Sequence, residues 1–273
     1  MPGFTEVADG VFVLRYPVLD VNSTLVVGDG EALLVDTLST PAQAGELVAA
    51  VRHVTPLPYR VVNTHHHFDH CFGNVVAAAP GSEVWGHERC AAVLAETGER
   101  RLVELAVEFP ELAGGILATV VRPPDRTVHS DAVLDVGGRT VQLEYLGRGH
   151  TDNDLVVVVP DAATVIAGDL VEECGPPGFD DSWPLDWPAT AAALLEVADG
   201  LVGTVTVIPG HGAPVDEAFV AAQHADLAQL AWLCREGHRD DRPPQDVAAR
   251  SPFGAEVSLL AVRRAYADLD GRL

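Results

Sequence analysis

The stretch Thr64-His65-His66-His67-Phe68-Asp69-His70 follows Tyr59-Arg60-Val61-Val62-Asn63, a short and mostly apolar run that predicts a buried strand. Imidazole and carboxylate groups lose hydration when they are buried, and only strong partners replace it. A metal ion is such a partner, because histidine nitrogens and carboxylate oxygens are its common ligands. His65 and His67 are two residues apart, and Asp69 and His70 follow directly, so we expect the loop to serve two ions side by side. The alternative interpretation is a solvated polar loop.

Three more polar residues follow predicted strands, and each is preceded by a glycine: His150, Asp169 and His211. Glycine lets the backbone turn sharply and come close to an ion. Open α/β sheets commonly bind ligands at the carboxyl ends of their strands. A single Gly-His or Gly-Asp pair is weak evidence for a site. Three of them in this order, together with the dense histidine loop, indicate a metal centre.

These residues resemble the signature of the metallo-β-lactamase superfamily, and the resemblance covers nearly all of residues 10–215. Its parts are Asp36 at a strand end, the His-x-His-x-Asp-His loop, and then His150, Asp169 and His211. The resemblance implies an α+β fold, a four-layer αββα sandwich. In it, two mixed β-sheets are flanked by helices, and the metals lie at one edge between the sheets.

The resemblance also implies a ligand set. The first ion would be held by His65, His67 and His150, the second by Asp69, His70 and His211, and Asp169 would bridge both. Aspartate at 169 and the unsubstituted loop are similar to the dinuclear hydrolase branch. The sulfur dioxygenases of the superfamily bind a single iron instead. We therefore expect two divalent cations, with zinc as the first choice and iron or manganese compatible with the same ligands.

Two cations that share an oxygen ligand would acidify a water between them from a pKa of about 15.7 toward 7. The resulting hydroxide would attack an acyl carbon or a phosphorus. Asp69 has a second expected role, as the acceptor of a proton or hydrogen bond from that nucleophile. We expect Asp36 and Thr64 to orient the ligand imidazoles, although Asp36 could instead be an ordinary turn residue. His66 should point away from the ions.

The composition excludes several classes of partner. The chain has 40 acidic and 17 basic residues, a formal charge of −23, and no lysine. Such a field repels nucleic acid and anionic membranes, so we expect a small-molecule substrate. No signal peptide and no membrane-spanning run is visible. The four cysteines are far apart, which favours reduced thiols and a cytoplasmic location.

Apolar runs bounded by turn residues predict the strands, and apolar positions at helical spacing predict the helices. The expected strands are 11–14, 23–27, 32–36, 59–63, 82–86, 132–136, 140–145, 154–159, 164–168 and 204–208. The expected helices are 41–54, 73–79 and most of 88–118, a segment to which we assign no role. We interpret residues 1–273 as one domain, with residues 214–273 as a mainly helical C-terminal cap.

The segment Val171–Trp187 leaves directly from Asp169 and holds two of the four tryptophans. We expect Phe179, Trp183 and Trp187 to line the substrate pocket. The alternative is that the tryptophans anchor the loop to the core.

The function that we expect is hydrolysis of a small ester, thioester, lactone or amide by a metal-bridging hydroxide. Two specific forms stay open. Hydroxyacylglutathione hydrolases (glyoxalase II) share the loop and the bridging aspartate. Class B β-lactamases are usually exported and often use a lysine, whereas this chain has no lysine and shows no signal peptide. A nuclease or phosphodiesterase is disfavoured by the negative charge. A non-catalytic or flavodiiron-type module is disfavoured by the intact ligand set, since flavodiiron proteins carry a glutamate where His67 stands.

Overall fold

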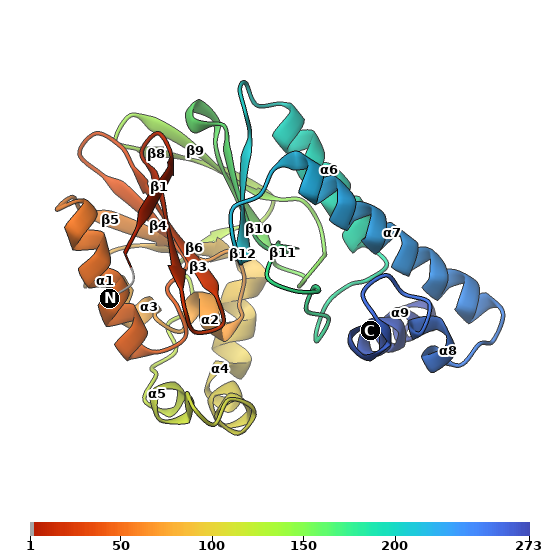
Figure 1. Cartoon of the computed structure of the whole chain (residues 1–273). Helices are drawn as coiled ribbons and strands as arrows, with labels where there is room; N and C mark the ends of the chain where they lie inside the picture. Colours follow the sequence, from red (N-terminus) through yellow and green to blue (C-terminus); the bar gives the residue numbers. More distant parts are fainter. Residues whose placement is uncertain (1–2) are drawn as a thin grey trace.

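The computed structural model describes residues 3–273 and has mixed α and β structure (Figure 1). The strands are β1 (Thr5–Ala8), β2 (Val11–Tyr16), β3 (Val21–Val27), β4 (Ala32–Val35), β5 (Tyr59–Val62), β6 (Val84–His87), β7 (Arg126–Val128), β8 (Asp131–Val136), β9 (Arg139–Tyr145), β10 (Leu155–Val159), β11 (Thr164–Glu172) and β12 (Thr206–His211). The helices are α1 (Pro41–Val54), α2 (Phe68–Cys71), α3 (Asn74–Ala77), α4 (Glu88–Glu108), α5 (Ala113–Leu117), η1 (Pro160–Ala162), α6 (Trp187–Asp199), α7 (Glu217–Arg239), α8 (Pro244–Ala248) and α9 (Ala255–Leu269).

The strands form two halves. The order in the first half is β7-β6-β5-β4-β3, with β2 and β1 attached to β3, and the order in the second half is β12-β11-β10-β9-β8. Each half mixes parallel and antiparallel pairs. The structure differs in one respect from the predicted pair of separate sheets. Val21 of β3 pairs with His211 of β12, and this pairing joins the two halves into one continuous strand order.

Side-chain alternation along the strands shows how the layers stack. In β4, Leu33 and Val35 point into a buried cluster shared by both halves, while Ala32 and Leu34 pack on the α1 side. In β10 all five residues are buried, and alternate valines belong to the shared cluster and to the cluster beneath α6 and α7. A strand buried on both faces needs no polar alternation.

The layers are therefore helix, sheet, sheet and helix, with apolar cores in the three spaces between them. Figure 1 shows α1 and α3 on one side of the strands and α6 and α7 on the other. This arrangement confirms the predicted αββα sandwich. Among the described residues, no helix is both long and apolar enough to cross a bilayer.

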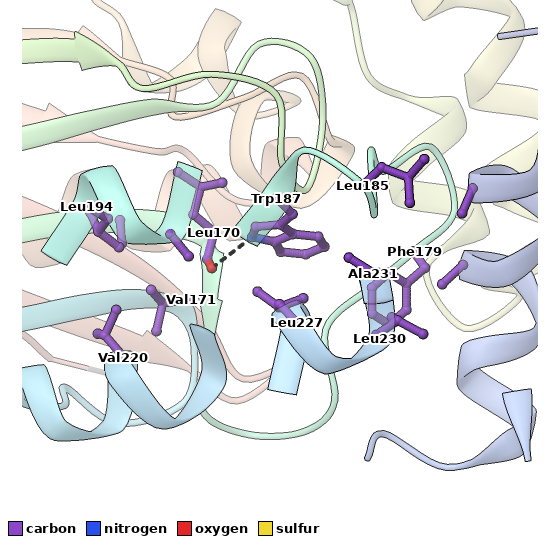
Figure 2. Packing of buried hydrophobic residues seen from close by; sticks show 14 of the residues in the cluster. Leu170, Val171, Phe179, Leu185, Trp187, Leu194, Val220, Leu227, Leu230 and Ala231 are labelled. Carbon is purple, nitrogen blue, oxygen red and sulfur yellow. Dashed lines mark hydrogen bonds between the residues drawn. The ribbon is translucent and has the colours of Figure 1, made fainter. Parts of the chain in front are cut away.

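Helix α6 is the main element that the sequence interpretation missed. Its first residue, Trp187, was placed in the loop, although Pro188 in the first turn is a common helix start. Trp187 is completely buried, and its indole Nε1 donates to the Leu170 carbonyl at 3.3 Å. Figure 2 shows it packed among Leu170, Leu227 and Phe179. The short edge strands β1 and β7 were not predicted either.

Candidate metal centre

The histidine loop connects the carboxyl end of β5 to the short helix α2. His65 and His67 precede the helix, and Asp69 and His70 lie in its single turn. The Asn63 amide donates to the His70 carbonyl at 3.2 Å, which ties the turn back to the strand. Four potential ligands therefore leave the backbone within one tight curve at the edge of the sheet.

A first group of donors comprises His65, His67, His150 and Asp169, whose ligand atoms all lie within 4.8 Å of one another. His67 Nδ1 is 2.8 Å from His150 Nε2. Asp169 Oδ2 is 3.6 Å from His65 Nε2 and 3.3 Å from His150 Nε2. These residues come from both halves of the sandwich.

A second group comprises Asp69, His70 and His211, again within 4.8 Å. His211 Nε2 lies 3.3 Å from His70 Nε2 and 3.4 Å from Asp69 Oδ2. Asp169 reaches this group as well, with Oδ1 at 3.1 Å from His70 Nε2 and Oδ2 at 3.4 Å from His211 Nε2. The structure thus brings all seven predicted ligands together, with Asp169 between the two groups.

The donors fit divalent cations. Two ligand atoms on a tetrahedral ion with bonds of about 2.0–2.1 Å lie about 3.3 Å apart, close to the distances within both groups. Among the described residues, His65 Nε2 is buried and has no hydrogen-bond partner, and Asp169 Oδ1 is buried and lies near His70 Nε2 without forming a hydrogen bond to it. Orphaned buried atoms of this kind are rare, because each costs roughly 1–3 kcal/mol. An ion between the groups would satisfy them.

Asp36 supports one imidazole in each group. Its Oδ2 accepts from His70 Nδ1 at 2.8 Å and from the Thr64 hydroxyl at 2.8 Å, while Oδ1 accepts from the Thr64 backbone at 2.8 Å. Thr64 Oγ1 is also 3.0 Å from His65 Nδ1. A proton on each Nδ1 leaves Nε2 of His65 and His70 free to face an ion. Asp36 and Thr64 thus lie where the sequence analysis expected them.

Asp169 lies within β11, not at the end of a strand as expected. Gly168 before it has φ +54°, and the register with β12 shifts on both sides of this point. A Cβ on Gly210 would lie 1.7 Å from Asp169 Oδ1. The carboxylate therefore enters the centre through space that Gly210 leaves open, after a backbone conformation that Gly168 permits.

The electrostatics of the cluster favour positive charge at its centre. Burial opposes ionisation of Asp169, but the surrounding histidines, His70 first, hold the pKa of its carboxyl well below the usual range. Burial also disfavours the His211 cation, yet the surrounding carboxylates, Asp169 first and then Asp69 and Glu172, together offset this and raise the pKa of His211 to about 10. At His150 burial prevails and lowers the pKa to about 4. Carboxylates and imidazoles so arranged suit a bound cation.

Sequence reasoning missed Asp181 and Glu172. Asp181 contacts both His66 and His67, and the ligand atoms of these three residues also lie within 4.8 Å of one another. His66 is not among the members of the two groups that share Asp169. No local spacing could reveal a contact across 114 residues. Glu172 has a carboxylate oxygen near Asp169 and His211. Glu172 follows Asp169 by three residues, and in a regular strand two such side chains would point to opposite faces. The register shift between Gly168 and Glu172 brings both side chains to the same side of the strand.

The three expected pocket residues lie elsewhere. Phe179 and Trp187 are buried in the core beneath α6 and α7, as Figure 2 shows. Trp183 is half-buried and stacks on the Arg148 guanidinium at 3.8 Å. These contacts favour the interpretation in which the tryptophans anchor the loop.

A cavity of about 320 Å³ opens instead beside His66 and His67, against helix α4. Its wall is partly apolar and partly polar, and Arg100, Arg101, Glu104, Asp180 and Asp181 contribute the charged groups. The apolar lining consists of Phe68, Phe72, Val93, Leu94 and Leu105. Helix α4 belongs to the segment that had no assigned role.

Comparisons with known proteins agree with this geometry. A curated hydroxyacylglutathione hydrolase from Xanthomonas euvesicatoria pv. vesicatoria is 36% identical over 107 residues. That match covers 37% of this chain and 40% of the relative, so the chain spans well under half of its curated relative.

Two solved structures show the fold. A metallo-β-lactamase from Pontibacter korlensis has a TM-score of 0.68 at 20% identity, covering 84% of this chain and 99% of that one. The metallo-β-lactamase FIM-1 from Pseudomonas aeruginosa, in its mono-zinc form, has a TM-score of 0.66 at 17% identity, covering 84% and 96%. The family profile described as the metallo-beta-lactamase superfamily matches residues 16–211, which include every residue of both donor groups. The chain belongs to the metallo-β-lactamase superfamily.

Proposed function

We propose that this chain is a metal-dependent hydrolase of small acyl substrates: esters, thioesters, lactones or amides. The observation that carries the proposal is the convergence of seven histidine and aspartate side chains into two groups that share Asp169. His65, His67, His150 and Asp169 would hold one ion, and Asp69, His70, His211 and Asp169 a second. Bound divalent cations supply Lewis acidity and lower the pKa of water toward 7. Zinc suits this nitrogen and oxygen donor set, and iron or manganese tolerate it.

The protein side chains orient the reacting groups and handle the proton. Asp69 lies at the edge of the second group, with Oδ2 3.4 Å from His211 Nε2 and 3.8 Å from His70 Nε2. A carboxylate there can accept the proton that an attacking water gives up. Thr64 and Asp36 hold the imidazole rings of His65 and His70 from behind, so the donors need little rearrangement.

The cavity beside α4 supports a small substrate. At about 320 Å³ it is at the lower end of ligand pockets, and it could hold the part of an acyl substrate that does not react. Its mouth reaches His66 and His67, next to the first donor group. The net charge of −23 continues to disfavour nucleic acid as a partner.

A thioester of glutathione is the substrate suggested by the curated relative. Two of the C-terminal arginines are already engaged, because Arg235 binds the Leu185 carbonyl and Arg264 binds the loop at residues 180–182. Arg100 and Arg101 at the cavity share Glu104 in exposed ion pairs, which are weak. These two arginines are the more available partners for a carboxylated substrate.

The test is a panel of a β-lactam, a lactone, S-lactoylglutathione and a phosphodiester, offered to protein whose metal content has been measured. We expect hydrolysis of at least one acyl substrate, loss of that activity on chelation, and its return with zinc. His65→Ala should abolish it, while the exposed His53→Ala should not. Metal-loaded protein that cleaves only the phosphodiester would contradict the proposal.

The cavity can be tested separately by filling it. Thr97 of α4 lines it, whereas Glu96 lies on the exposed side of the same helix. Thr97→Phe should raise KM for the bulkier acyl substrates and leave the metal content unchanged. Glu96→Phe is the matched control and should leave KM unchanged. Equal KM values in the two variants would place the substrate elsewhere.

A further inference from the structure

The carboxylate of Asp181 lies between two neighbouring imidazoles. Its Oδ1 is 3.0 Å from His67 Nε2, and its Oδ2 is 3.2 Å from His66 Nε2. The other nitrogen of His67, Nδ1, faces His150 Nε2 at 2.8 Å. His67 therefore turns Nδ1 toward the first donor group and Nε2 toward Asp181.

The backbone around Asp181 has no helix or strand to hold it. It is held instead by Arg264, which lies on the C-terminal helix α9. The guanidinium donates to three consecutive carbonyls: Nε to Ser182 at 2.6 Å, Nη2 to Asp181 at 2.8 Å, and Nη1 to Asp180 at 3.4 Å. Because Arg264 is half-buried, these donors have few water molecules to compete with.

The same loop also reaches His150. The Gly178 carbonyl is 3.2 Å from His150 Nδ1, so His150 can donate to it and keep Nε2 free for the first group. Two of the three histidines of that group thus donate their outer hydrogen bond to residues 178–181, His67 to Asp181 and His150 to Gly178. The third, His65, donates its own to Thr64.

We propose that Asp181 is a positioning residue for His67 and that Arg264, on helix α9, fixes the position of Asp181. The C-terminal helix then contributes to the metal affinity of the first group without touching an ion. A carboxylate that accepts from one imidazole nitrogen fixes the tautomer and makes the other nitrogen a better ligand. The inference rests on the metal site of the proposed function, but not on the identity of its substrate.

The first experiment measures zinc affinity by competition with a chromophoric chelator, and the cobalt(II) absorption spectrum of the same proteins. Asp181→Ala should weaken zinc binding at the first donor group by about 10- to 100-fold, the range for lost partners of metal ligands, and should change the cobalt bands. Asp180→Asn alters an exposed neighbour and keeps the backbone, so it should match the wild type.

The second experiment tests the link to α9. Arg264→Gln should weaken the same site, whereas Gln in place of the exposed Arg263 should not. Because Arg264 acts through Asp181, the double variant Asp181→Ala/Arg264→Gln should bind zinc no more weakly than Asp181→Ala alone. Arg264→Lys should restore part of the affinity. A general loss of stability would instead add to the effect of Asp181→Ala and would lower the melting temperature without changing the cobalt bands.

The outcomes separate this inference from the proposed function. Wild-type zinc affinity and cobalt bands in Asp181→Ala would overturn the inference, even in an active hydrolase. Weakened zinc binding in a protein that hydrolyses no acyl substrate would overturn the proposed function and support the inference. A wild-type chain that takes up no zinc or cobalt would overturn both.

Discussion

Replacing Asp36 by asparagine should lower the affinity of both donor groups at once. Asp36 is almost completely buried and accepts three hydrogen bonds, from the backbone and hydroxyl of Thr64 and from His70 Nδ1. Asparagine offers one oxygen and one amino group in the same space. Whichever way its amide turns, at least one donor faces the amino group.

The cost can be worked out from these contacts. A hydrogen bond to a buried charge contributes about 1.5–3 kcal/mol, so Asp36→Asn should destabilise folding by roughly that amount. If the His70 ring responds by moving its proton to Nε2, the nitrogen that faces the second group can no longer bind an ion. Loss of such a partner typically weakens metal binding by about 10- to 100-fold, equivalent to about 1.4–2.7 kcal/mol.

The assay is chelator competition for zinc, with metal content measured after dialysis and melting temperatures recorded with and without zinc. Thr64→Val is the informative partner variant. It breaks the link from Asp36 to His65 but leaves the contact to His70, so it should weaken the first site only. Wild-type affinity and two retained ions in Asp36→Asn would refute the reasoning.

Three other predictions follow from described contacts. Gly210→Ala should abolish metal retention, because the new Cβ would lie 1.7 Å from Asp169 Oδ1; metal analysis checks this. Burial raises the pKa of Asp154 to about 7, so its carboxyl binds a proton more tightly in the folded than in the unfolded state. The metal-free protein should therefore lose stability, on the order of 4 kcal/mol, as pH rises from about 4 to about 7; urea titrations should show this slope and its absence in Asp154→Asn. Trp187→Ala should destabilise by about 3–5 kcal/mol, whereas Trp183→Ala, which loses a half-buried stacking contact with Arg148, should cost about 1 kcal/mol or less and leave KM unchanged; thermal unfolding and steady-state kinetics compare the two.

Each of these predictions has an outcome that contradicts it. Gly45→Ala is the control for the glycine substitution, since a Cβ there meets nothing within 4 Å; equal metal content in both alanine variants would remove the argument from close approach. A stability that is flat between pH 4 and 7 would show that Asp154 keeps an ordinary pKa. A raised KM for Trp183→Ala would return that residue to the substrate pocket.

The sequence was informative where contacts are local. The histidine loop, its strand and the glycine-preceded ligands could be found because each carries its signal within a few residues. The alternation that separates the layers is likewise a property of each strand, but the αββα sandwich itself was expected from the resemblance to the metallo-β-lactamase superfamily. Asp36 and Thr64, which were expected to orient the ligand imidazoles, both adjoin predicted strand ends.

What the sequence could not show depends on contacts between distant segments. Asp181 meets His67 across 114 residues, and its place is set by Arg264 from another helix. Phe179 and Trp187 were assigned to the pocket because they follow Asp169 closely, yet apolar burial draws them into the core. The cavity beside α4 likewise depends on packing, which residue spacing cannot reveal.

The single pairing of Val21 with His211 has a consequence for how the molecule matures. Each donor group takes residues from both halves of the sandwich, since Asp69 and His70 need His211, and His65 and His67 need His150. During synthesis the loop leaves the ribosome well before its counterparts, so the first donor group would be complete only once Asp169 of β11 is in place, and the second only once β12 has docked with His211. If zinc is tightly held, only fully folded molecules would retain it. The fraction of metal-bearing molecules in a preparation would then measure the fraction that had finished folding.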